Sequence, residues 1–153
     1  MTLRPPVHAD IPALQALLET IALFPAGMLP EMIAPCFTGG EDAPVWLVRT
    51  RGELVVGFCF AEPEPMTEGT WNMRAIGVAH DHQGAGHGAA LVHGLEDTLR
   101  TRGGRILIVD TSGTEDFAGA RTFYRQRGYA EEARIRDFWS TGDDKIVFRK
   151  ALA

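Results

Sequence analysis

Residues 75–92 decide the fold, and they read AIGVAHDHQGAGHGAALV. An apolar, strand-like end at residues 75–78 is followed by a polar connector at residues 79–83 and then by three glycines in five positions. From residue 86 onward the apolar residues change to helical spacing, and one stripe carries Leu91, Val92, Leu95 and Leu99. The stretch therefore predicts a strand, a glycine-rich loop and an amphipathic helix that begins at the loop.

The loop predicts a site for a diphosphate group. Three glycines let the backbone approach a ligand closely, because no Cβ stands in the way. The N–H groups of the first helical turn have no partner in the helix and lie at the positive end of its dipole, so an anion binds there readily. The predicted cradle consists of Gln83, Gly84, Ala85, Gly86, His87 and Gly88.

Two other interpretations of the loop remain open. Gly84-x-Gly86-x-x-Ala89 satisfies a dinucleotide-binding fingerprint, and Asp110 ends the next predicted strand, where a ribose-binding acid belongs. However, the polar connector separates the loop from its strand, and too little chain follows for a doubly wound half. The loop could also be a turn that only packs helix on strand, although three glycines weaken a helix start. No Gly-Lys-Ser/Thr follows, which excludes a P-loop.

The rest of the pattern predicts a mixed α/β fold with a single domain over residues 1–153. Asp10 is expected to cap a first helix, and the apolar run Arg105–Asp110 is expected to form a strand buried on both faces. A further helix is expected near residues 117–128. The other predicted strands lie at residues 3–4, 45–48, 54–60, 70–78, 133–139 and 146–148.

The composition is that of a globular domain, with 45% hydrophobic and 23% charged residues. With a formal net charge of −5, the chain lacks the excess of basic residues that is typical of a nucleic-acid binder. No apolar run approaches the ~20 residues that span a bilayer, and no signal peptide is visible. Cys36 and Cys59 form no disulfide framework, so the sequence favours a cytoplasmic protein that binds neither nucleic acid nor membrane.

Two blocks of the sequence together resemble the GCN5-related N-acetyltransferase (GNAT) family. Residues 83–88 are similar to the family's motif A, written Q/R-x-x-G-x-G/A. Residues 118–129, with Phe123-Tyr124 and Gly128-Tyr129, are similar to its "A..FY...GF" segment. The detailed match covers residues 71–129, and the order of elements extends it to the whole chain. The resemblance implies a twisted mixed sheet with a splayed central parallel strand pair and helices on both faces.

The resemblance also implies an acetyl-CoA-dependent N-acetyltransferase that moves an acetyl group to a primary amine by direct attack in a ternary complex. The backbone of Ile76, Gly77 and Val78 would bind the pantetheine arm, and the N–H groups from Gly84 to Gly88 would bind the pyrophosphate, with Gln83 at the start of the loop. His87 replaces the usual aliphatic residue, which leaves the role of its side chain open. The alternative is an acyl-CoA-binding sensor or regulatory module with little catalysis.

Tyr124 aligns with the family's general acid. A tyrosine with a reference pKa near ~10 is protonated at neutral pH and can donate to a departing thiolate, whose reference pKa is near ~8.5. The alternative for Tyr124 is an ordinary core residue of an amphipathic helix. The general base is less clear, because the middle of Thr70–Val78 carries no acid. Glu68 is the suggested base by strand alternation, and Asp110 and Asp116 are weaker options.

The acceptor is expected to be a small-molecule or peptide amine, bound by residues 25–37, 62–69 and 139–145. Its identity, the acyl chain preference and the oligomeric state cannot be inferred, and a homodimer stays open. Several histidines cluster near the loop, but no acid or Cys completes a ligand set, so no metal is expected. Trp71 and Trp139 are expected in the core, with the lining of the acceptor pocket as the alternative. Arg121, Arg125 and Arg127 are expected on a solvated helix face, with an anion site as the alternative.

Overall fold

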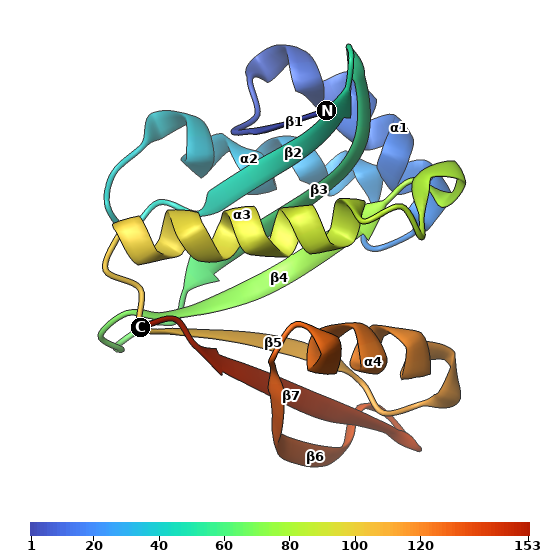
Figure 1. Ribbon diagram of the computed structural model, residues 1–153. Coiled ribbons are helices and arrows are strands. Elements are labelled where there is room, and N and C mark those ends of the chain that lie inside the picture. The colour runs from blue at the N-terminus through green and yellow to red at the C-terminus, as the bar shows by residue number, and fades with distance from the viewer.

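The computed structural model describes all 153 residues, and its framework is one seven-stranded sheet (Figure 1). The strands lie in the order β1-β2-β3-β4-β5-β7-β6, and every neighbouring pair is antiparallel except β4 and β5. The predicted mixed α/β class is confirmed. The strands are β1 (Thr2–Arg4), β2 (Val45–Arg51), β3 (Leu54–Pro63), β4 (Thr70–Val78), β5 (Ile106–Ser112), β6 (Ala130–Ser140) and β7 (Asp143–Ala151).

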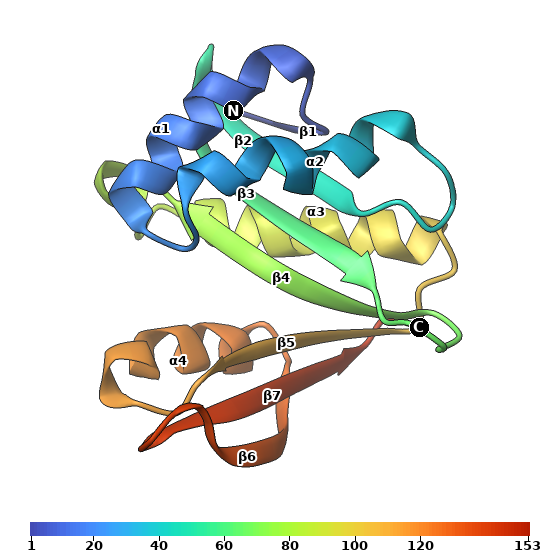
Figure 2. The same ribbon diagram turned by 180° about the vertical axis from the view of Figure 1, so that it is seen from behind.

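Helices cover both faces of the sheet. Figure 1 shows α3 and α4 on one face, and Figure 2 shows α1 and α2 on the other, over β2 to β4 but not over β5 and β7. No helix combines the length and the apolar character that crossing a membrane requires. The helices are α1 (Ile11–Ile21), α2 (Leu29–Thr38), α3 (His87–Thr101) and α4 (Ala118–Gln126), and a short 3-10 turn precedes each of them.

Two hydrophobic clusters follow from this layering. The cluster under α3 and α4 joins the helical stripe of α3 to Met73, Leu107 and Phe148, and the cluster under α1 and α2 is built around Trp46 and Phe58. Alternate residues of β2, such as Leu47 and Val48, and of β3, such as Cys59 and Phe60, enter opposite clusters, as a period of two requires. Since a single helical or sheet face cannot bury itself, both layers are needed to close the core.

The parallel strands β4 and β5 are joined for only part of their length. Their paired residues are Thr70–Asn72 on β4 and Ile106–Ile108 on β5. Beyond this point β4 stays paired with β3 as far as Val78, whereas β5 stays paired with β7, so the two strands separate (Figure 1). Arg74 is an extra residue in β4, a β-bulge opposite the step from Phe60 to Ala61. The predicted splayed pair is confirmed.

Two local expectations were wrong. The carboxylate of Asp10 does not cap α1; it accepts hydrogen bonds from the Arg4 guanidinium at 2.7 and 2.9 Å and from the Val7 N–H at 2.7 Å. Strand β5 is buried on one face only, because Ile106 and Ile108 point to the side where no helix covers it and are only half-buried. That uncovered side becomes one wall of the site.

Candidate active site

A cleft of about 530 Å³ occupies the gap where β4 and β5 separate. Its walls are residues 73–78 of β4, the glycine loop with the start of α3, the end of β5, and α4. Segments that are far apart in the sequence are thus brought to one place by the splay. The lining residues from β5 and from the α4 region are Val109, Asp110, Thr111, Phe117, Ala120, Phe123, Tyr124 and Arg127.

The glycine loop presents unused hydrogen-bond donors to this cleft. None of the six backbone N–H groups from Gly84 to Ala89 donates within the protein, and the first bond of the helix runs from Ala90 N to the Gly86 oxygen at 3.0 Å. Gly84 and Gly86 have φ of 78° and 87°, a left-handed backbone that L side chains rarely adopt. Together with the dipole of α3, these donors form a site for an anion with several oxygens.

Gln83 sets where the loop starts. Its side-chain amide donates to the Val78 carbonyl oxygen at 3.0 Å, so the loop is tied back to the end of β4. Nearby, His80 Nε2 lies 3.0 Å from the Thr20 carbonyl oxygen of α1. These contacts hold the polar connector in place and thereby fix the distance between the strand and the helix.

Gly77 and Gly88 allow side chains from elsewhere to pack closely. A Cβ at Gly88 would lie 3.2 Å from the Phe123 ring, so this glycine lets α4 approach the loop. A Cβ at Gly77 would lie 2.3 Å from the end of the Ile21 side chain, which packs there from α1. Gly88 therefore has a packing role in addition to the ligand access expected of the loop glycines.

Residues Ile76 to Val78 form the open edge of β4. They pair with β3 on one side, and no strand pairs with them on the side toward β5. Backbone N–H and C=O groups on that edge are therefore free to bond an extended ligand in the cleft, as an added strand would.

Tyr124 lies in the cleft with its ring packed against Phe123, Tyr129 and Phe148. Its side chain is only 6% exposed, and burial raises the pKa of Tyr124 to about 12. No group of the protein hydrogen-bonds its hydroxyl. The hydroxyl is therefore a neutral, uncommitted donor at physiological pH.

Asp110 is the acid that the structure brings to the cleft. Its Oδ2 lies 3.3 Å from the Asn72 amide nitrogen and 3.4 Å from the Lys145 ammonium, while its Oδ1 is buried without a partner. Asp110 points to the uncovered side of β5, whereas Tyr124 belongs to the cluster under α3 and α4. The two side chains thus line the gap from opposite faces of the sheet.

Glu68 is not among the residues that line the cleft. It precedes β4 at the joined end of the strand pair, where its carbonyl oxygen accepts a hydrogen bond from Arg105 at 2.6 Å. The first lining residue of β4, Met73, is five positions further on, which is ~16 Å along an extended strand. Glu68 lies in the bend before β4, and Gly69 has a φ of 76°, so strand alternation does not extend to Glu68 and could not tell where the strands separate. Asp116 does not line the cleft either.

An aromatic bulge stands beside Asp110. Between Ile135 and Ser140 the strand β6 leaves its register with β7, and Asp137 adopts a φ of 56°. Phe138 and Trp139 are in consequence 48% and 49% exposed, so the expectation of a core position for Trp139 was wrong, whereas Trp71 is in the core. The Trp139 indole N–H donates to the Thr111 carbonyl oxygen at 3.3 Å, which attaches the bulge to the end of β5.

His87 lies at the first position of α3 and is 4% exposed. Its Nδ1 accepts a hydrogen bond from Arg49 Nε of β2 at 3.3 Å, and burial together with the Arg49 charge lowers its pKa. The neutral ring thus anchors the start of α3 to the sheet. Arg127, which was expected on a solvated face, is half-buried in the cleft wall with its guanidinium 4.4 Å from the Phe123 ring centre. No group of three or more potential metal ligands is present.

Comparison with known proteins gives consistent results. The model of the acetyltransferase (GNAT) family matches residues 13–129. A solved structure of a protein assigned to the GNAT family from Desulfovibrio desulfuricans is 29% identical, with 99% of each chain covered and a TM-score of 0.91. No curated protein matches the chain.

Two more distant solved structures share the fold. A ribosomal-protein-alanine N-acetyltransferase from Brucella melitensis is 21% identical, with 99% of each chain covered and a TM-score of 0.82. An aminoglycoside 6'-N-acetyltransferase complexed with coenzyme A is 18% identical, with 100% of this chain and 98% of that chain covered and a TM-score of 0.82.

Proposed function

The chain belongs to the GNAT family of acetyltransferases, and we propose that it transfers an acetyl group from acetyl-CoA to a primary amine by direct attack in a ternary complex. The observation that carries this proposal is the cleft between β4 and β5. It joins six unused backbone donors at one end to the uncommitted hydroxyl of Tyr124. The two sets of groups match the charged and the reacting ends of one long donor molecule.

The lining of the cleft fits that donor. The N–H groups from Gly84 to Ala89 offer the convergent donors that a diphosphate needs, and Gln83 holds their loop in place. The open edge of β4 at Ile76, Gly77 and Val78 offers backbone partners for the amides of a pantetheine arm. When bound, acetyl-CoA supplies the activated thioester, so the protein itself needs no acyl-carrying nucleophile.

The proposed chemistry uses Tyr124 as the acid. The amine nitrogen forms a bond to the acyl carbon, and the bond from that carbon to sulfur breaks. Tyr124 donates its proton to the departing sulfur, for which a hydroxyl with a pKa of about 12 is protonated at any physiological pH. Holding the amine and the thioester together in one cleft supplies a further large part of the rate enhancement.

Asp110 takes the place of Glu68 as the proposed base. An acceptor amine with a reference pKa near ~10.4 arrives as an ammonium and must lose a proton before it attacks. Asp110 lines the cleft on the face opposite Tyr124, with one oxygen unpartnered, and is placed to accept that proton directly or through water.

The acceptor is proposed to enter from the uncovered side of β5. There it would meet the carboxylates of Glu64 and Asp110 and the half-exposed rings of Phe138 and Trp139, a combination that favours a cationic small molecule or peptide. The expected cytoplasmic location and the single domain stay predictions, and the acyl chain preference and a homodimer stay open.

A thiol-release assay with acetyl-CoA over peptides, polyamines, amino acids and aminoglycosides tests the proposal. We expect release with at least one amine, and stabilisation against melting by about 2.7 kcal/mol at 100 times the dissociation constant of acetyl-CoA. Absence of any stabilisation by acetyl-CoA refutes donor binding. Stabilisation without thiol release over the whole panel favours the sensor alternative.

A further inference from the structure

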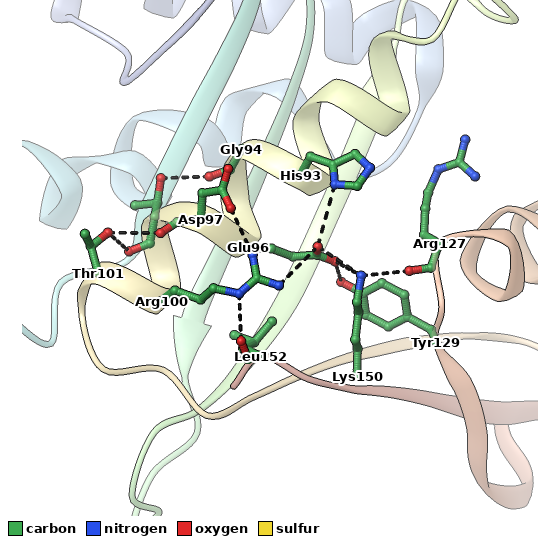
Figure 3. Close-up of polar contacts among 11 residues, drawn as sticks. His93, Gly94, Glu96, Asp97, Arg100, Thr101, Arg127, Tyr129, Lys150 and Leu152 are labelled. Carbon is green, nitrogen blue, oxygen red and sulfur yellow. Dashed lines mark hydrogen bonds and ion pairs between the residues drawn. The ribbon is translucent and has the colours of Figure 1, made fainter.

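A buried ionic cluster on α3 lies outside the proposed chemistry (Figure 3). The carboxylate of Glu96 is only 1% exposed, yet four groups face it: Tyr129 and Lys150 from the other half of the sheet, and His93 and Arg100 of α3 itself, each at 3.9 Å. The Tyr129 hydroxyl donates to it at 2.6 Å, and the Lys150 ammonium lies 3.1 Å from each of its oxygens. Burial, reinforced by the Glu96 charge, holds the pKa of the Tyr129 hydroxyl far above its usual value, so that hydroxyl remains a donor.

This cluster joins the two halves of the split sheet. Glu96 belongs to α3, which packs on β2, β3 and β4, whereas Tyr129 begins the connection into β6 and Lys150 lies on β7. Strands β4 and β5 themselves share only three residue pairs. The contacts of Glu96 are therefore a second attachment between the halves, on the α3 side of the sheet and next to the paired strand ends, because Lys150 pairs with Leu107 of β5. We call Glu96, Tyr129 and Lys150 the Glu96 clasp.

The clasp leads directly to the backbone of Tyr124. The Lys150 ammonium donates to the Arg127 carbonyl oxygen at 2.8 Å. The backbone N–H groups of Arg127 and Tyr129 both donate to the Tyr124 carbonyl oxygen, at 3.0 and 3.1 Å. The rings of Tyr124 and Tyr129 are also in edge contact, with centres 6.1 Å apart. Tyr129 and Lys150, the two partners of Glu96 in the half of the sheet that contains β5, β6 and β7, thus both contact the end of α4, whose last turn carries Tyr124.

Stability alone is a poor reason for such a cluster. A buried ion pair gains little over apolar residues of the same shape, because desolvation cancels much of its attraction. Its hydrogen bonds are directional, however, and hold their partners in one geometry. A group that must reach a reacting atom needs that kind of restraint, since a displacement of ~1 Å can cost about 100-fold in rate.

We propose that Glu96 is a positioning residue that holds Tyr124 in place for proton donation. This inference rests on the proposed function, because it assigns Tyr124 the role of acid. The clasp fixes the end of α4 against α3, and α3 also carries the donor-binding loop. The distance between the bound donor and the Tyr124 hydroxyl is in this way set by one buried carboxylate.

The test is a comparison of Glu96→Gln with the wild-type protein and with Asp10→Asn. In Glu96→Gln the amide can still accept from Tyr129 but turns a donor or a neutral oxygen toward Lys150. We expect kcat to fall by roughly 10- to 100-fold, within the range for a displaced acid, while KM and Kd for acetyl-CoA change less than two-fold. Asp10→Asn disrupts another buried carboxylate–cation pair, far from the cleft, and should lower the melting temperature without lowering kcat.

A double-mutant cycle separates positioning from general damage. If Glu96 acts through Tyr124, Glu96→Gln should add almost no loss of kcat once Tyr124 is already Phe. An equal fold-loss in both backgrounds overturns the proposal, and so does a loss in Glu96→Gln no larger than that in Asp10→Asn.

Amide hydrogen exchange tests the clasp even if the protein shows no thiol release. Glu96→Gln should speed exchange of the Arg127 and Tyr129 amides, while the amides in the centre of α3 stay protected. If the wild-type protein releases no thiol but these amides respond, the proposed function fails and the clasp stands as a structural attachment. Unchanged exchange at both amides overturns the clasp itself, whatever the activity.

Discussion

Replacing Gly86 by Ala isolates the donor-binding role of the glycine loop. A Cβ at Gly86 would have no atom within 4 Å, so the substitution causes no clash. The cost is backbone strain alone, because φ is 87° and an alanine in the left-handed region loses roughly 1–2 kcal/mol. In the free protein the loop can relax, since its N–H groups from Gly84 to Ala89 bond nothing. Binding would restore the strained conformation, so the cost should appear in affinity.

The expected result is a rise in the dissociation constant of coenzyme A by roughly 5- to 30-fold, which corresponds to those energies. Isothermal titration calorimetry measures it, with a melting curve of each variant. Gly103→Ala is the matched control at the other end of α3: its φ is 77°, its Cβ would also be unobstructed, and it lies outside the cleft. Backbone hydrogen bonds hold that turn, so this control should lose stability and keep its affinity.

The opposite pattern would refute the reasoning. If Gly86→Ala binds coenzyme A within two-fold of the wild type and melts as early as Gly103→Ala, the loop conformation is not what the donor uses. A loss of affinity in both variants would instead mean that damage to α3 in general, and not the loop, weakens binding.

Three further predictions concern the chemistry. Tyr124→Phe should lower kcat by roughly 100-fold or more in thiol release, with the Kd of coenzyme A unchanged, because only the acid is lost. Since burial raises the pKa of Tyr124 to about 12, the protonated form persists below that pH, and kcat should not decline between pH 7 and about 10; a basic limb near 10 would contradict this. Asp110→Asn should lower kcat at pH 7 and recover as the pH approaches the acceptor's own pKa, near ~10.4 for a lysine-like amine, and a loss that is the same at every pH would exclude Asp110 as the base.

Local sequence patterns were enough to predict much of the fold. The expected strand at residues 70–78 has the same bounds as β4, and the predicted helix begins at the glycine loop, with α3 starting at His87. These features depend on neighbours in sequence: β-forming residues, three glycines and a stripe of leucines. The mixed class follows from the order of such elements, whereas the splayed pair was expected from the resemblance to the GNAT family.

The site was harder to predict because it depends on distances through space. Pairing of β4 with β5 ends after Asn72, so Glu68 stands before the joined part of the pair, whereas Asp110 lies beyond it and lines the cleft. Trp139 has an apolar ring, but the break of register near Asp137 turns it outward. Because Asp is common in turns of every kind, its presence at residue 137 does not by itself predict a break in the strand register.

Glu96 did leave a signal that the sequence analysis passed over. It stands four residues after Val92 and three before Leu99, within the apolar stripe of the helix. A charged side chain at such a position is buried only when it pairs with an opposite charge or with hydrogen-bond donors. The partner, Lys150, is 54 residues away on the last strand, and no periodicity reveals it.

The extra residue at Arg74 acts as a phase shift within a single strand. Before it, Trp71 and Met73 point into the cluster under α3; after it, Ile76 and Val78 do, so odd positions have exchanged faces with even ones. Gly77 in this way comes to lie beneath Ile21, where a larger residue has no room. Both parts of β4 pair with β3, whereas only the part before the bulge pairs with β5. Deleting one residue here would turn four consecutive side chains to the wrong face, a disturbance that no single substitution in the cleft could equal.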